Sequence, residues 1–197
     1  IDIHSKTASE IFGVPVESVT EEMRRVAKTV NFGVVYGISP FGLSESLNIS
    51  QKEASLYIEN YFNQHPSVKQ YIDDTIKSAR SLGFVTTIMG RKRQIPEINS
   101  PNASIRQQAE RFAINTPIQG TAADLIKIAM INLWGRLNKQ GLKTKMILQI
   151  HDELLFETPE HEIDVAKEII KQEMENAMKL KVPIRVDIRW GKNWAEA

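Results

Sequence analysis

The nine residues Ile147–Leu155, with the sequence ILQIHDELL, decide the fold class because they describe two short strands joined by an acidic turn. Alternation with a period of two runs from Met146 to Ile150, as a β-strand requires. A second extended run follows at Leu154–Glu157. We therefore expect a β-hairpin that carries Asp152 and Glu153 at its tip.

Two interpretations of this acidic tip are open from these residues alone. Asp is a good turn former, so both acids could simply face water. However, the usual glycine or asparagine is absent, and charge beside buried apolar strands is costly unless a cation neutralises it. Mg²⁺ is commonly held by one or two carboxylates together with substrate phosphates, which makes phosphoryl transfer the first reaction class to test.

A second pattern lies in the stretch RRVAKTVNFGVVYG, residues 24–37. Arg24, Lys28, Phe32 and Tyr36 recur every four residues, a step that drifts only about 40° around a helix. Cations can hold a triphosphate, and a ring further along can stack on a sugar or base. The alternatives are a solvated cationic face and aromatic residues that belong to the core.

Local signals give this helix its expected limits. Ser18 followed by Glu21 fits a capping box, which places the start near Val19, and Gly37 is a natural stop. Gly33 lowers helix stability by about 1 kcal/mol relative to alanine. We therefore expect another backbone or a base pair to approach closely at Gly33.

Composition narrows the class of protein without deciding it. A chain of 197 residues with 42% hydrophobic residues suits one or two globular domains. The absence of cysteine excludes disulfides and thiolate metal sites, and no apolar run is long enough to span a bilayer, so a reducing, cytoplasmic setting is expected. Net charge is only +1, but a local basic zone could follow a phosphate backbone. Its members are Lys77, Arg80, Arg91, Lys92, Arg93, Arg106 and Arg111.

The coarse pattern is helical, with short strands, and predicts an α+β fold. A turn-rich segment near residues 100–105 is the expected boundary between a helical part, residues 1–103, and an α+β part, residues 104–197. Two further helices, 104–115 and 121–140, are expected to be separated by Pro117 and Gly120. The remaining helices are expected at about residues 5–12, 19–36, 41–48, 51–63, 66–82 and 160–179, and strands near 84–89, 93–95 and 184–189.

Four segments resemble those of the family A DNA polymerases, in the same order and spacing. RRVAKTVNFGVVYG resembles motif B of that family, and LQIHDELLFE resembles its motif C. GRKRQIPEI at Gly90–Ile98 and AERFAINTPIQGTAADLIKIAM at Ala109–Met130 are also similar to family segments. The similarity extends from DIHSKTA near the start to GKNWAEA at the end.

This resemblance implies a helical fingers subdomain, residues 1–103, followed by the C-terminal part of a palm, residues 104–197. Motif A, which carries a metal-binding Asp, lies upstream of the DIHSKTA segment in the family. The chain is therefore expected to be the C-terminal piece of a longer DNA polymerase, inactive alone and completed by the missing N-terminal part. A non-catalytic module that binds nucleotide and DNA, or complements a split polymerase, is the alternative, and a single-subunit RNA polymerase is a weaker one.

The resemblance also assigns roles to residues near the incoming nucleotide. Arg24, Lys28 and His4 match family positions close to the triphosphate of a dNTP, although His4 could equally be a structural histidine. Phe32 matches the ring that packs on the sugar, and Tyr36 the ring near the templating base.

Further residues match family positions at the DNA and the metal ions. Arg111, Asn115 and Gln119 correspond to residues that contact primer and template, with a polar stripe between helices as the alternative, and His151 corresponds to one beside the primer terminus. Asp152 and Glu153 are the expected ligands of two Mg²⁺ ions in the intact enzyme, and these acids with Lys28 are the expected catalytic residues.

Overall fold

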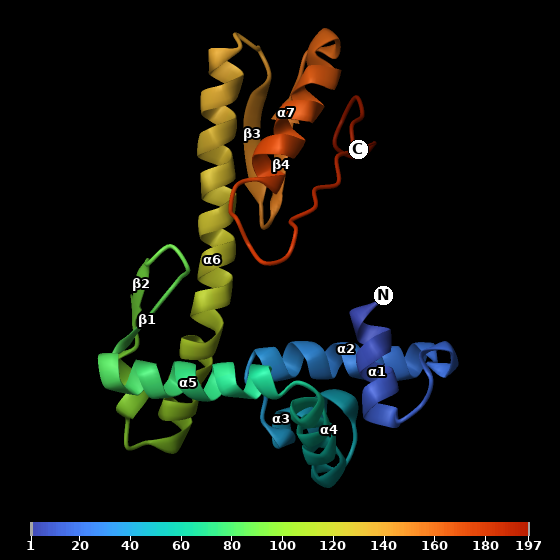
Figure 1. Cartoon of the computed structure of the whole chain (residues 1–197), viewed down its shortest axis with the longest axis vertical. Coiled ribbons are helices and arrows are strands. Elements are labelled where there is room, and N and C mark those ends of the chain that lie inside the picture. Colours follow the sequence, from blue (N-terminus) through green and yellow to red (C-terminus); the bar gives the residue numbers. More distant parts are fainter. Residues whose placement is uncertain (1, 197) are drawn as a thin grey trace. The chain divides into compact units, whose positions relative to one another are not determined.

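The computed structural model describes residues 2–196, and the chain divides into two compact units. The first is Ile1–Ile118 and the second is Gln119–Ala197, and helix α6 (Ala103–Lys139) contributes to both (Figure 1). The expected α+β class is confirmed, with helices and two antiparallel hairpins. The division into fingers and palm at residue 103 is a functional one and stays a prediction.

The first unit is mainly helical. Local signals set several of its ends: Asp2 caps α1, Ser50 and Glu53 form a capping box on α4, and Pro66 begins α5. Before α6 its elements are α1 (Ile3–Phe12), η1 (Val16–Ser18), α2 (Glu21–Val35), α3 (Pro40–Leu47), α4 (Gln51–Gln64), α5 (Pro66–Leu82), β1 (Phe84–Thr86), β2 (Lys92–Gln94) and η2 (Pro96–Asn99).

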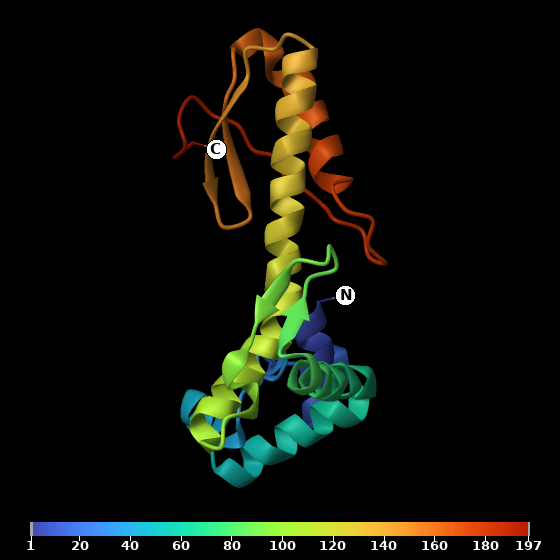
Figure 2. The same ribbon diagram turned by 90° about the vertical axis from the view of Figure 1, so that its left-hand side faces the viewer.

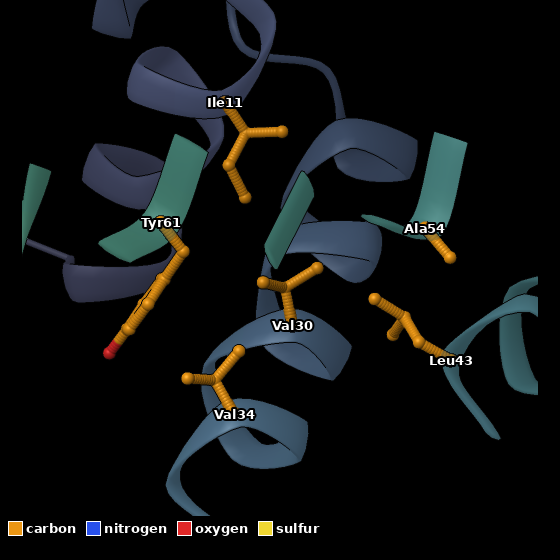
Figure 3. Close-up of a cluster of buried hydrophobic side chains, with 6 residues drawn as sticks. All are labelled: Ile11, Val30, Val34, Leu43, Ala54 and Tyr61. Atoms are coloured by element: carbon orange, nitrogen blue, oxygen red, sulfur yellow. The ribbon is translucent and has the colours of Figure 1, made fainter. Parts of the chain in front are cut away.

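A cluster of buried side chains fixes α2 against its neighbours. Val30 and Val34 on the inner face of α2 pack with residues from α1, α3 and α4. Figure 3 shows the cluster, which comprises Ile11, Val30, Val34, Leu43, Ala54 and Tyr61. Because this face of α2 is anchored in the core, the opposite face is presented to solvent in a fixed orientation.

A second cluster joins α5, the β1–β2 hairpin and the first turns of α6. It consists of Ala79, Val85, Ile95, Ile98, Ala109 and Ala113. The hairpin pairs Phe84 with Gln94 and Thr86 with Lys92, and it is visible in both views (Figure 2). Its outer side chains bind α6, because the guanidinium of Arg93 lies 4.7 Å from the centroid of the Phe112 ring.

The expected start of α2 was wrong by two residues. Thr20, not Ser18, caps the helix, because its side chain accepts the N–H of Met23 at 3.2 Å. Ser18 ends the short helix η1. The expected stop at Gly37 agrees with the structure, since α2 ends at Val35 and Gly37 has a φ of +71°.

The expected break at Pro117 and Gly120 was also wrong, because α6 continues through both residues. A proline inside a helix removes one backbone donor, and here neighbouring contacts hold the helix on the N-terminal side of it. The hydroxyl of Tyr71 donates to the carbonyl of Ile114 at 3.2 Å, and Arg93 donates to Thr116 Oγ1 at 3.1 Å. Tertiary contacts therefore override the local breaking signal.

The second unit packs a helix and a hairpin around the C-terminal half of α6. Its further elements are β3 (Lys145–Ile150), β4 (Glu153–Glu157), η3 (Glu160–Glu162) and α7 (Ile163–Glu175). Leu133 and Leu137 of α6 pack against Ala166, Ile169 and Ile170 of α7. The hairpin confirms the expected strands, with an irregular register between Met146 and Leu148.

At the end of the chain one expected element is shorter and another is absent. The helix expected over residues 160–179 is present as a short 3₁₀ turn followed by α7, which ends at Glu175. Residues 184–189 form no strand; instead the N–H of Val186 donates to the carboxylate of Glu175 at 3.1 Å. A strand needs a partner, and no strand of the described residues pairs with this segment. No helix among residues 2–196 is long and apolar enough to cross a bilayer.

Candidate active site

The exposed face of α2 borders a cavity of about 520 Å³. Three members of the four-residue pattern, Lys28, Phe32 and Tyr36, line this cavity. Its other lining residues are Arg25, Thr29, Gly33, Ile38 and Arg111. Two further cations thus accompany Lys28, and the pocket combines positive charge with aromatic surface.

The two rings of α2 are surface features and not part of the core. Phe32 is 49% exposed and Tyr36 is 42% exposed. Their planes are nearly parallel, inclined by 12°, with centroids 6.4 Å apart, and the ring of His4 lies 5.8 Å from that of Phe32. The alternative of core aromatics is thus excluded by their exposure, and their faces are available to a planar ligand.

Arg24 points to a different neighbour. Its Nε donates to Asp2 Oδ2 at 2.5 Å, and Arg24 does not line the cavity. The bond from Arg24, with a second from Ser5, lowers the pKa of Asp2 well below its usual range, and the same contact raises the pKa of Arg24. Arg24 and Tyr36 are twelve residues apart. The angular drift of each four-residue step accumulates over this distance, so the two side chains do not share one face of the helix.

His4 is held by a polar bridge between α1 and α2. Asn31 Nδ2 lies 3.0 Å from His4 Nδ1, and Asn31 Oδ1 lies 3.1 Å from the hydroxyl of Thr7. The half-buried imidazole is therefore fixed through its Nδ1 next to Phe32.

Two glycines allow the chain to turn back beside the cavity. A Cβ at Gly33 would lie 2.8 Å from Cγ2 of Ile38, so the close neighbour is a side chain of the same segment. The close neighbour at Gly33 is thus a side chain and not another backbone, and the approach of a base pair stays a prediction. A Cβ at Gly37 would lie 3.2 Å from Cγ of Arg111, which lets α6 approach the end of α2.

Arg111 and Asn115 lie one turn apart on α6, and Arg111 lines the cavity beside the rings. Asn115 has its Oδ1 buried without a hydrogen-bond partner among the described residues. An unpaired buried carbonyl oxygen costs free energy, so it is a site where a donor would bind. Gln119 is exposed on α6, in the second unit.

The acidic tip in the second unit is a two-residue turn, His151 and Asp152, between β3 and β4. His151 adopts a φ of +52°, and the side chain of Gln149 donates to its carbonyl at 3.0 Å. Asp152 and Glu153 are both exposed. Their charges therefore face solvent at the turn.

The strands beside this tip are less buried than expected. Ile147 is 54% exposed and Leu148 is 45% exposed. Because these apolar side chains are exposed, the two acids do not stand beside buried strands. The expectation that their charge is energetically costly at this position is therefore wrong for this chain.

A family model described as DNA polymerase family A matches residues 1–196. The chain belongs to the family A DNA polymerases. DNA polymerase I of Caldicellulosiruptor bescii is 55% identical over 196 residues, which are 100% of this chain and 23% of that protein. DNA polymerase I of Geobacillus stearothermophilus is 50% identical over 197 residues, 100% of this chain and 22% of that protein.

A solved structure agrees with the family assignment. The POL domain of Pol1 from M. smegmatis, in a complex with DNA primer-template and dNTP, matches with a TM-score of 0.93 and 43% identity, over 100% of this chain and 35% of that chain. The chain spans less than a quarter of the length of the two DNA polymerase I relatives named above.

For a family A polymerase, the donor chemistry of Asp152 and Glu153 suits Mg²⁺, which prefers hard carboxylate oxygens. Two carboxylates alone are too few ligands to hold the ion. Within residues 2–196, no group of three or more acidic, histidine or cysteine side chains could hold a metal ion. The two acids have the donor chemistry for Mg²⁺ but do not form a complete metal site within the described residues.

Several residues that shape the cavity and its surroundings were not predicted. Arg25, Thr29 and Ile38 reach the cavity from between and beyond the predicted positions, which a four-residue pattern does not include. Asp2 carries a recognisable helix-capping signal, but its bond to Arg24 joins residues that are 22 positions apart. No local signal marks Asn31.

The basic zone is largely engaged within the first unit. Arg80 pairs with Glu110 at 2.5 Å, Arg106 donates to the carbonyl of Ser100, and Lys92 lies over the ring of Phe84. These cations stabilise the fold around the hairpin, so their number overstates the charge that is free to meet DNA.

Proposed function

We propose that this chain is the nucleotide-selecting part, and one portion of the metal-binding part, of a template-directed DNA polymerase. In that reaction the primer 3′-oxygen forms a bond to the α-phosphorus of a dNTP, and pyrophosphate leaves. One observation carries the proposal: exposed, stacked Phe32 and Tyr36 follow Lys28 along one cavity in a family A chain.

The nucleotide would lie along α2 with its phosphates towards the N-terminal end. Lys28 supplies a point charge, and Arg24 supplies a planar guanidinium with nitrogens to spare for phosphate oxygens. His4 is fixed by Asn31 beside Phe32, between the expected phosphate and sugar positions. Lys28 would also oppose the charge that develops on the leaving pyrophosphate.

The rings set the position of the sugar and base. Phe32, between His4 and Tyr36, offers an apolar face to the sugar, and Tyr36 offers one to the base or its template partner. Base–aromatic stacking contributes about 1–3 kcal/mol per base and tolerates any sequence. That tolerance suits an enzyme whose template, and not its own residues, selects the base.

Primer and template would be held by polar side chains outside the stacking platform. We assign Arg111, Asn115, Gln119 and His151 to this role. The unpaired Oδ1 of Asn115 supports it, because a donor on a base edge would satisfy that oxygen. The side chains of Gln119 and His151 are exposed, and each can donate and accept hydrogen bonds.

Asp152 and Glu153 would hold Mg²⁺, with two ions in the intact enzyme. When bound, such ions lower the pKa of a hydroxyl and neutralise charge on phosphate oxygens. The two carboxylates cannot balance about four positive charges, so the N-terminal part of the polymerase would add further ligands. The isolated chain would accordingly be inactive.

A second function is supported by one specific observation. Among the described residues, no group of three or more acidic, histidine or cysteine side chains could hold a metal ion, so the chain could serve only as a nucleotide- and DNA-binding module that complements another piece. Restoration of the upstream part separates the two functions. Catalysis predicts primer extension that Asp152→Asn abolishes, whereas a binding module predicts DNA retention without extension in both proteins.

A further inference from the structure

The N-terminus of α1 and the first turns of α2 are joined through a single carboxylate. Asp2 Oδ1 accepts the N–H of His4 at 3.1 Å and so caps α1. Asp2 Oδ2 accepts both the hydroxyl of Ser5, at 2.8 Å, and Nε of Arg24, at 2.5 Å. Both oxygens of Asp2 are therefore engaged.

Only one edge of the Arg24 guanidinium is used by this contact. Among residues 2–196, neither Nη of Arg24 has a protein acceptor within hydrogen-bond distance. A guanidinium presents its two Nη groups as a fork that suits phosphate oxygens. The contact at Nε fixes the plane of this fork and leaves the fork itself free.

We propose that Asp2 is a positioning residue, which holds Arg24 so that its two Nη groups are oriented for the phosphates of the incoming nucleotide. This inference rests on the proposed function, in which Arg24 binds the triphosphate. Its physical basis is pre-organisation: an arginine that is already ordered loses less conformational freedom when the ligand binds.

A purely stabilising role explains the contact less well. The side chains of Arg24 and Asp2 are 39% and 38% exposed, and exposed ion pairs contribute little to stability. Asp2 also carries a negative charge, which alone would repel a triphosphate. Positioning and repulsion have opposite signs: loss of Asp2 weakens nucleotide binding if it positions Arg24, and strengthens it if repulsion dominates.

The test uses substitutions that keep the cap of α1. Serine and asparagine are both good N-cap residues, but serine is too short to reach Arg24. Asparagine keeps only one acceptor oxygen, whereas Asp2 uses Oδ1 for the cap and Oδ2 for Arg24, so one of these two contacts loses its present acceptor. Glu17→Ser removes the same charge from an exposed position outside the site and is the matched control.

In the polymerase restored with its upstream part, Asp2→Ser and Asp2→Asn should raise the KM for dNTPs by about two- to tenfold, with kcat nearly unchanged. Glu17→Ser should leave both constants at the parent values. In an Arg24→Ala background, Asp2→Ser should have no further effect on KM, because its target is gone.

The outcomes separate this inference from the proposed function. If Arg24→Ala raises KM but Asp2→Ser leaves it unchanged or lowers it, the positioning role is refuted and the nucleotide site stands. An equal KM increase from Asp2→Ser with and without Arg24 also refutes it. If Arg24→Ala itself leaves nucleotide use unchanged, both the positioning role and the placement of Arg24 at the triphosphate are wrong.

Discussion

The ring of Phe32 lies nearly parallel to that of Tyr36, one helical turn along α2, with 6.4 Å between the centroids. Both rings are exposed, although the opposite face of the same helix is fully buried at Val30. A helix that is anchored on one side and aromatic on the other holds a rigid platform at low cost in conformational entropy. The predictions for the nucleotide depend on this platform.

Phe32→Tyr should reduce discrimination against dideoxynucleotides in the restored polymerase. A dNTP brings a 3′-hydroxyl to the sugar edge, whereas a dideoxynucleotide leaves that edge empty beside an apolar ring. Tyrosine would supply a hydroxyl there, an effect of about 1–3 kcal/mol or roughly ten- to hundredfold in selectivity. Competition between ddNTP and dNTP measures the ratio of their incorporation efficiencies in the parent and the variant. The same ratio in both proteins would show that Phe32 does not face the sugar.

Loss of a phosphate-binding cation should differ from loss of a metal ligand. Arg24→Ala and Lys28→Ala should chiefly weaken dNTP use, because in the proposed site these cations contact charge that is already present on the bound nucleotide. Asp152→Ala should abolish the chemical step. Single-turnover rates over a range of dNTP concentrations distinguish these effects. If all three variants lose only primer-template affinity, the α2 cations hold DNA instead.

Two glycines in helices should respond oppositely to alanine. At Gly33 the new Cβ would meet Ile38 at 2.8 Å, so Gly33→Ala should lower the free energy of unfolding by about 1–3 kcal/mol. Gly135, inside α6, has no atom within 4 Å of such a Cβ. Gly135→Ala should therefore raise the free energy of unfolding by about 0.5–1 kcal/mol. Urea unfolding of the parent chain and the two variants measures both changes. Stabilisation by Gly33→Ala would show that Ile38 moves aside freely.

Glu162 should make the second unit sensitive to acid. Its carboxylate accepts the N–H groups of Lys143 and Thr144, each at 2.9 Å, and the hydroxyl of Thr144 at 2.8 Å. These bonds, led by that of Lys143, lower the pKa of Glu162 below its ordinary 4.5. The pKa of Glu162 is lower in the folded chain than in the unfolded chain. The stabilisation that its carboxylate contributes is therefore complete above about pH 4.5 and is lost as pH falls through the lowered pKa.

Glu162→Gln tests this linkage. At neutral pH the amide should lower the unfolding temperature by roughly 5 °C, since one backbone N–H then faces an NH₂ group. Below pH 4.5 the difference between parent and variant should shrink. Thermal unfolding from pH 7 to pH 3 measures it, and a difference that is constant with pH would contradict the role of the ionised carboxylate.

Local patterns predicted the elements that carry the site. The alternation in Met146–Ile150 indicated the hairpin, and the four-residue repeat placed Lys28, Phe32 and Tyr36 on one helix face. Both depend on periodicity along a few residues, which the folded chain preserves.

Contacts between distant residues could not be predicted in this way. Pro117 is tolerated inside α6, with Tyr71 and Arg93 bonded to the turn before it. Arg24 turns towards Asp2, a partner that its own helix does not reveal. A helical repeat specifies only the direction in which a side chain leaves its own helix. The tolerance of Pro117 and the partner of Arg24 depend instead on which other element packs beside that helix.

The most direct test of the account is primer extension by the pure chain, with and without the upstream part of the polymerase. Each sample contains a primed template, dNTPs and Mg²⁺, and is repeated with Asp152→Asn. We predict background extension by the chain alone and clear extension after the upstream part is added, lost again in Asp152→Asn. Metal-dependent extension by the pure chain, abolished by Asp152→Asn, would contradict the claim that its carboxylates are only part of the catalytic metal site.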